Sequence, residues 1–111
     1  MTQNSVNLIG RLGKEPDVKR FGETEVANFS IATDRSWKDK NGEWQAKTTW
    51  HNIVKWRPGD LVKNAKPGYL VSIQGSYEDD SYQDESGNTI RRMVVQAEKV
   101  YVFKVGSIQA P

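Results

Sequence analysis

Cysteine is absent from the 111-residue chain, and histidine occurs once, at His51. The absence of cysteine excludes disulfides, thiol catalysis and Cys-ligated zinc, and a single histidine leaves almost no metal constellation. We therefore expect no metal and no cofactor. We also expect no enzymatic activity, because the sequence shows no positioned acid, base or nucleophile. A structural role is the simplest interpretation of a lone histidine.

Long apolar runs are also missing. No stretch approaches the roughly 20 apolar residues of a membrane span, and the first ten residues, "MTQNSVNLIG", have no basic segment followed by an apolar one. We expect a cytoplasmic protein without a membrane partner. The length and the 36% hydrophobic content suit one core, so we assign residues 1–106 to a single domain and 107–111 to a short extension.

Charge is unevenly distributed, although the net charge is only +2. Residues 76–90 contain five acidic residues and no basic one, whereas the rest of the chain has 16 basic and 9 acidic residues. A positive surface with one acidic patch favours a polyanionic partner, and an ordinary solvated surface is the alternative. The five acidic residues are Glu78, Asp79, Asp80, Asp84 and Glu85.

Apolar residues recur with period two, which predicts strands at 6–12, 18–21, 25–33, 48–56, 69–77 and 90–103, the last bent near 97–99. In 25–33 we expect Ala27, Phe29 and Ile31 to face the core, and in 69–77 Val71 and Ile73. Pro58 and Pro67 leave room for a short helix at 60–65. This order predicts an all-β, five-stranded barrel of the oligonucleotide-binding (OB) type with long hairpin loops; an SH3-like barrel is the main rival.

All four tryptophans lie between residues 34 and 56, among lysines and arginines. Asn41-Gly42 predicts a two-residue type I′ hairpin turn. This turn would place Trp37 opposite Ala46 and Trp44 opposite Asp39, so that both rings share one face, with Lys38, Lys40 and Lys47 on the other.

Alternation in the following strand groups Trp50, Asn52, Val54 and Trp56 against Thr49, His51, Ile53 and Lys55. The same two-residue turn would put Phe29 and Trp50 on one face, so an irregularity is needed if one is core and the other exposed. Two interpretations stay open. The rings form stacking platforms for bases beside cations that follow a phosphate backbone, or Trp50 and Trp56 are core and the other two stabilise the hairpin.

Five motifs in order resemble the bacterial-type single-stranded DNA-binding protein family. They are "NSVNLIGRLGKEPDVKRF", "EVANFSIATDRSWKDKNGEW", "TTWHNIVKW", "PGYLVSIQGSY" and "VVQAEKVYVF". The resemblance implies an OB fold, coating of single-stranded DNA with little sequence preference during replication, recombination and repair, and assembly into homotetramers, with a dimer as the minimum. It also implies location at the nucleoid or at phage or plasmid replication sites.

Trp37 and Trp50 match the family's stacking tryptophans, Trp56 occupies the place of a third aromatic, and Tyr82 resembles the aromatic in the loop after the fourth strand. His51 matches a position at the subunit interface, to which we add Val6 of the first strand. The candidate nucleic-acid-binding residues are Trp37, Trp44, Trp50, Trp56, Tyr82, Arg35, Lys38, Lys40, Lys47 and Arg57.

Three departures limit the resemblance: a short helical connection, an acidic loop "SYEDDSYQDESGN", and an end at "KVGSIQAP" without the family's linker and acidic-aromatic tip. A trimmed chain and a tailless phage- or plasmid-like relative both explain that end, and we do not count tail-mediated replication and repair partners among the expected ones. Two other functions compete with DNA coating. One is a primosomal replication-restart protein of the same fold, and the other is a nuclease that holds Mg²⁺ on the acidic loop.

Overall fold

The computed structural model describes residues 1–105, which form eight strands and one short helix. The expected extension at 107–111 lies outside the described residues. In chain order the elements are β1 (Val6–Leu12), β2 (Asp17–Phe21), β3 (Thr24–Lys38), β4 (Trp44–Trp56), α1 (Asp60–Lys63), β5 (Leu70–Asp79), β6 (Tyr82–Gln83), β7 (Thr89–Ile90) and β8 (Met93–Phe103).

Five of these strands close into a barrel. The main sheet runs in the order β1-β5-β8-β4-β3-β2, and β1 also pairs with β3, which joins the two sides. All pairings are antiparallel except that of β4 with β8. The predicted five-stranded OB barrel is therefore confirmed, with β2 extending the sheet beyond β3.

The core follows the alternation read from the sequence. Ala27, Phe29 and Ile31 of β3 are buried, as are Val71 and Ile73 of β5, and all five predictions are confirmed. Ile31, Ile53, Ile73, Val71 and Val95 are the largest fully buried side chains in the described part of the chain. Full burial of one such side chain is worth about 1.5–3 kcal/mol relative to exposure, so the inner faces of β3 and β4 are strongly specified.

The helix is shorter than predicted, because α1 ends at Lys63 instead of residue 65. The predicted bend near 97–99 is confirmed. Gln74 pairs with Lys99 but Gly75 pairs with Ala97, so that Glu98 is an extra residue, a β-bulge, in β8.

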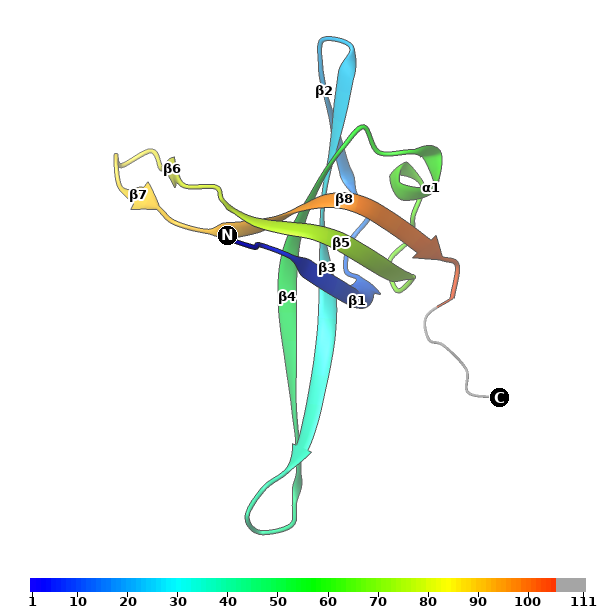
Figure 1. The fold of residues 1–111 in the computed structure, drawn as a ribbon, viewed down its shortest axis with the longest axis vertical. Helices are drawn as coiled ribbons and strands as arrows, with labels where there is room; N and C mark the ends of the chain where they lie inside the picture. The colour runs from blue at the N-terminus through cyan, green and yellow to red at the C-terminus, as the bar shows by residue number, and fades with distance from the viewer. Residues whose placement is uncertain (106–111) are drawn as a thin grey trace.

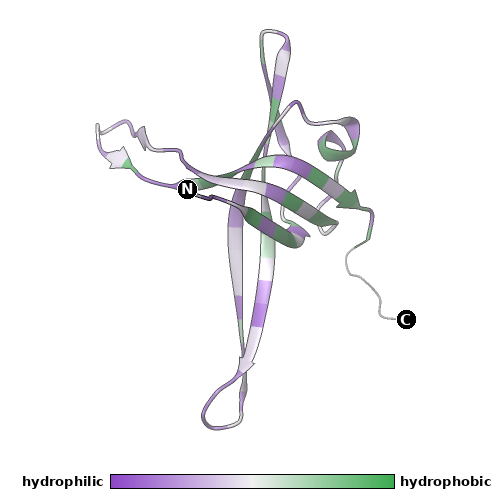
Figure 2. Cartoon of the chain, in the orientation of Figure 1, coloured by the Kyte–Doolittle hydropathy of each residue, from purple (hydrophilic) through white to green (hydrophobic). Residues whose placement is uncertain are grey.

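Three hairpins project from the barrel in different directions (Figure 1). The β3–β4 hairpin is the longest, the β2–β3 hairpin points away from it, and the β6–β7 hairpin leaves the barrel between β5 and β8. The most hydrophobic colouring gathers on β1, β5 and β8, whereas the far part of the β3–β4 hairpin is largely hydrophilic (Figure 2). The distal β3–β4 hairpin is therefore a surface structure.

The predicted two-residue turn at Asn41-Gly42 is wrong, because β3 and β4 are joined by a five-residue loop, 39–43. One oxygen of Asp39 accepts hydrogen bonds from the backbone N–H groups of Asn41 and Glu43, both at 2.9 Å. Gly42 has a φ of 79°, but Arg57 is the only non-glycine with a positive φ among the described residues, so Asn41 lacks the conformation that a type I′ turn needs. Local hydrogen bonds from backbone N–H groups to the Asp39 carboxylate outweigh the Asn-Gly preference.

Gly75, beside the bulge, offers a test of the barrel packing. A Cβ on this residue would lie 2.0 Å from the backbone oxygen of Gln96, so Gly75→Ala should force the β5 and β8 backbones apart. We expect a loss of about 1–3 kcal/mol in the free energy of unfolding, measured by thermal or urea denaturation. Gly59→Ala is the matched control, because its Cβ would meet nothing within 4 Å, and it should melt closer to the parent. Equal melting of the two variants would contradict the packing argument.

Candidate nucleic-acid interface

One face of the β3–β4 ribbon carries three tryptophans. Trp44 pairs with Lys38, Trp50 with Ala32 and Trp56 with Val26, and cross-strand partners share a face. Each tryptophan lies six positions after the previous one, or about 20 Å at the rise of a strand. The exposed fractions are 69%, 59% and 45%, so none of the three is a core residue. The interpretation of Trp50 and Trp56 as core is wrong.

The length of the loop explains how Phe29 can be core while Trp50 is exposed. Phe29 pairs with Ile53 and Trp50 with Ala32, so the two aromatic residues lie on opposite faces without any bulge between them. A two-residue turn would have needed a bulge to place these residues on opposite faces. The five-residue loop changes the pairing of β3 with β4 by one residue, so no bulge is needed.

Trp37 lies on the other face of the ribbon, opposite Gln45. The prediction that Trp37 and Trp44 share a face is therefore wrong, because the five-residue loop shifts the pairing by one residue. The grouping of the lysines changes for the same reason. Lys38 shares the face of Trp44 and its Nζ lies 5.9 Å from that ring, while Lys47 pairs with Arg35 on the face of Trp37.

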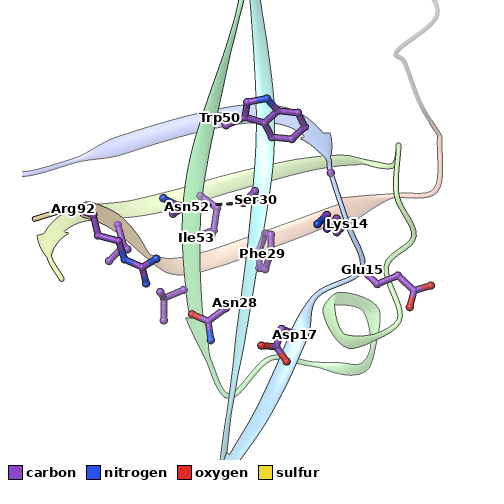
Figure 3. A pocket seen from close by; sticks show the side chains of 13 residues that line it. Lys14, Glu15, Asp17, Asn28, Phe29, Ser30, Trp50, Asn52, Ile53 and Arg92 are labelled. Atoms are coloured by element: carbon purple, nitrogen blue, oxygen red, sulfur yellow. Dashed lines mark hydrogen bonds between the residues drawn. The ribbon is translucent and has the colours of Figure 1, made fainter. Parts of the chain in front are cut away.

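A groove of about 520 Å³ lies against the outer face of β3 and β4. Trp50 stands at one end, Lys14 and Glu15 line one side, and Arg92 lies across from them (Figure 3). Asn52 and Ser30 lie between, with the Ser30 hydroxyl donating to Asn52 Oδ1 at 3.4 Å. The groove thus combines an exposed indole, two cationic side chains, the acidic side chains of Glu15 and Asp17, and neutral polar groups.

Gly13 supports the Trp50 ring. A Cβ on Gly13 would lie 2.6 Å from a ring carbon of Trp50, so the indole packs directly on the glycine backbone. The connection between β1 and β2 therefore determines where the ring of Trp50 lies.

Phe21 extends the aromatic surface and was missed in the sequence. Its ring centroid lies 6.0 Å from that of Trp56, and 58% of the residue is exposed. Lys19 pairs with Val26, which in turn pairs with Trp56, so alternation places Phe21 on the outer face as well. The sequence did contain a signal for Phe21. Alternation within 18–21 places Phe21 on the opposite face of the strand from Val18, which packs against the core.

The model of the single-strand binding protein family matches residues 3–103. The chain belongs to this family. The single-stranded DNA-binding protein of Neisseria meningitidis is 40% identical over 90 residues, covering 78% of this chain and 52% of that protein. The mitochondrial single-stranded DNA-binding protein of Drosophila melanogaster is 30% identical over 106 residues, covering 93% and 73%.

Among solved structures, the Plasmodium falciparum SSB complex with ssDNA matches with a TM-score of 0.80 and 33% identity, covering 93% of this chain and 95% of that one. The chain spans about half the length of the bacterial relatives it matches. The family assignment drawn from the five motifs is confirmed, and the alternative of a primosomal replication-restart protein is not favoured.

The remaining candidate residues of this family member are dispersed. Lys40 lies in the 39–43 loop, and Arg57, with a φ of 54°, follows Trp56 and donates its backbone N–H to Glu25 O at 2.9 Å. Tyr82 lies in the β6–β7 hairpin, where its ring is 5.8 Å from the guanidinium carbon of Arg92. Arg92 was missed, because no local pattern shows that it lines the groove.

The two expected interface residues differ in exposure. Val6 is 7% exposed and already packs in the barrel core, so its side chain leaves little surface for a second chain. His51 is half-buried, with Nε2 2.9 Å from Thr33 Oγ1. A role at an interface stays a prediction for both.

Two carboxylates of the β3–β4 hairpin have pKa values below their ordinary range. For Asp34 the main cause of the lower pKa is the Thr48 hydroxyl, which donates at 2.7 Å, followed by the nearby Arg11 guanidinium. For Asp39 the pKa falls mainly because the backbone N–H of Glu43 donates to the carboxylate, with a further hydrogen bond from Gln45. Asp39 is therefore ionised at neutral pH, and its charge helps to hold the loop that determines the faces of the tryptophans.

Gly13→Ala should displace the Trp50 ring without unfolding the barrel, because the ring is exposed and can move away from the new methyl group. We expect a shifted intrinsic fluorescence spectrum and weaker binding of a dT oligonucleotide, with a melting temperature within a few degrees of the parent. Unchanged fluorescence and binding would show that the glycine does not position the ring.

Proposed function

We propose that the chain binds single-stranded DNA with little sequence preference, by stacking bases on exposed aromatic rings and holding the backbone with lysine and arginine. The observation that carries the proposal is the outward placement of Trp44, Trp50 and Trp56 on one face of the ribbon, where Trp50 borders a groove that Lys14 and Arg92 also line. Membership of the family and the likeness to the Plasmodium complex with ssDNA support it. Coating of exposed strands during replication, recombination and repair follows as the proposed role.

The chemistry of this face suits binding without sequence preference. Every base offers a π-face of similar stacking strength, so an indole accepts any of the four, and a stacked base is worth about 1–3 kcal/mol. Cations lie beside the rings: the guanidinium carbon of Arg35 is 5.6 Å from the centroid of Trp37, and Lys38 Nζ lies over Trp44. A base on the ring and its phosphate on the neighbouring cation would use both groups of each pair.

The proposed role is binding without catalysis. Two acidic side chains of the acidic segment make local hydrogen bonds: Asp79, at the end of β5, accepts from Ser81 at 2.6 Å, and Asp84, between β6 and β7, accepts from the backbone of Ser86 and Asn88. Within residues 1–105 no group of three or more acidic or histidine side chains is placed to hold a metal ion. No helix described there is long and apolar enough to cross a membrane.

We also propose that identical chains assemble, with a tetramer expected and a dimer as the minimum. The outer face of β1, β5 and β8 supports this, because exposed Ile9 aligns through Ser72 with exposed Tyr101, and Phe103 lies two residues further along β8. This face lies on the other side of the sheet from the core residues, so a second copy can cover it without disturbing the barrel.

The stacking proposal is tested by alanine substitution of Trp44, Trp50 and Trp56, one at a time. Loss of one platform should cost about 1–3 kcal/mol of binding, a 5- to 150-fold weaker Kd for poly-dT, read by quenching of the remaining tryptophans. Because all three are exposed, each variant should melt near the parent, whereas truncation of a core tryptophan costs about 3–5 kcal/mol of stability.

Leu61→Ala is the control for that series, since Leu61 is 61% exposed and lies on α1, outside the groove lining. It should leave both the Kd and the melting temperature unchanged. A Trp50→Ala protein that melts far below the parent, while its folded fraction binds normally, would overturn the platform role of that residue.

Self-association is tested by light scattering at micromolar concentration. We expect a mass that is a multiple of the 12.6 kDa chain, and a shift toward smaller species for Tyr101→Glu, because a charge at the centre of an apolar contact loses its hydration. A parent protein that scatters only as a monomer would contradict the proposed assembly.

A further inference from the structure

Arg92 is a cationic residue of the groove that already has an anionic partner. Its Nε and Nη2 both donate to Asp80 Oδ2, at 2.8 and 2.6 Å, and its guanidinium carbon lies 5.8 Å from the centroid of the Tyr82 ring. A backbone hydrogen bond from Asp80 N–H to Arg92 O, at 2.9 Å, joins the same two residues at the base of the β6–β7 hairpin. The hairpin therefore holds Asp80 against the cation.

We propose that Arg92 is a phosphate-binding residue of the groove, and that the Asp80 carboxylate occupies its guanidinium until a phosphate of the DNA backbone takes that place. This inference rests on the proposed function. It gives Arg92 a specific contact with the DNA backbone, and it assigns a role to Asp80 within the acidic segment.

The chemistry of the guanidinium supports an exchange of partners. Its planar N–H groups suit carboxylate and phosphate oxygens alike, and Asp80 engages only two of the five N–H donors. The ion pair is half-exposed, because 45% of the Arg92 side chain and 48% of the Asp80 side chain are accessible. Water weakens such a pair, so displacement of the Asp80 carboxylate costs little free energy. A phosphate can bind the free donors first and then replace the carboxylate.

The position of Arg92 suits a nucleotide whose base lies on Trp50. Both residues line the same groove, and its volume is within the range that encloses small ligands (Figure 3). Lys14 lines the opposite side. A strand stacked on Trp50 would thus pass between Lys14 and Arg92. Of these two cations, Arg92 forms an ion pair with Asp80.

The acids of residues 78–85 are consequently not equivalent. Asp80 pairs with the groove cation Arg92, whereas Asp79 accepts a hydrogen bond from Ser81 and Asp84 accepts one from Asn88. If the acidic segment only repelled DNA in a general way, neutralising any one of its five acids would have a similar effect on the Kd. If Asp80 competes for Arg92, neutralising Asp80 has the largest effect.

The experiment measures Kd for a dT oligonucleotide of about 16 nucleotides, the upper end of one OB-fold site, at several salt concentrations. The variants are Asp80→Asn, Arg92→Gln, Arg92→Lys, the double variant Asp80→Asn with Arg92→Gln, and Glu85→Gln as the control with the same change of charge in the same hairpin. Thermal melting of each variant confirms that the barrel is intact.

If Asp80 competes with phosphate, Asp80→Asn should tighten binding by up to about fivefold, more than Glu85→Gln does. Arg92→Gln should weaken binding and reduce the slope of log K against log salt by about 0.7, as expected for one lost phosphate contact on a single strand. Arg92→Lys should bind with intermediate affinity. In the Arg92→Gln background, Asp80→Asn should have only the effect of Glu85→Gln.

An Arg92→Gln variant with unchanged affinity and salt slope would overturn the proposal, and so would equal effects of Asp80→Asn and Glu85→Gln. Trp50→Ala separates this failure from that of the proposed function. If the parent binds and Trp50→Ala binds weakly while Arg92→Gln is neutral, only the role of Arg92 is wrong. If the parent binds no DNA, both proposals fail.

Discussion

The alternation of side chains along β3 and β4 is the constraint on which the rest of the structure depends. Burial of Ile31 and Ile53 on the inner face obliges their neighbours in the same strands to point outward. A slip of one residue would expose the two isoleucines and bury Trp50, at a cost of several kcal/mol. The core therefore determines the orientation of the outer aromatic face.

Glycines determine how closely the other elements approach this ribbon. A Cβ on Gly10 would lie 2.6 Å from the backbone oxygen of Ala32, so a glycine allows β1 to cross from β5 to β3 and close the barrel. Three residues later, Gly13 provides the surface on which the Trp50 ring packs. One short segment of β1 and its connection thus serves both barrel closure and the placement of a candidate stacking residue.

The sequence was sufficient for the barrel because period-two alternation indicates the core positions of the central strands, such as Ile31 in β3 and Ile73 in β5. The sequence was insufficient for the distal hairpin. Turn propensities favour a two-residue turn at Asn41-Gly42 and do not account for the hydrogen bonds that Asp39 accepts in the loop. The faces of Trp37 and Trp44 were therefore misassigned. The role of Arg92 could not be predicted from the sequence for another reason. Its place in the groove depends on the path of the β6–β7 hairpin back to the barrel, which is a property of the tertiary structure.

The barrel end and the loop end of the β3–β4 ribbon respond differently to a change in the length of the 39–43 loop. Near the barrel, Trp50 and Trp56 belong to strands whose inner faces are anchored by Phe29, Ile31 and Ile53, so their outward direction does not depend on the turn. Beyond Asp34 both strands are exposed, so backbone pairing and the 39–43 loop hold the register of Trp37 and Trp44 without any buried side chain. A change in loop length would therefore be absorbed by a bulge in the exposed part of the hairpin, which costs less than a slip of the buried part. The groove and its Trp50 are consequently the structurally determined centre of the candidate interface, and the hairpin tip is its adjustable periphery.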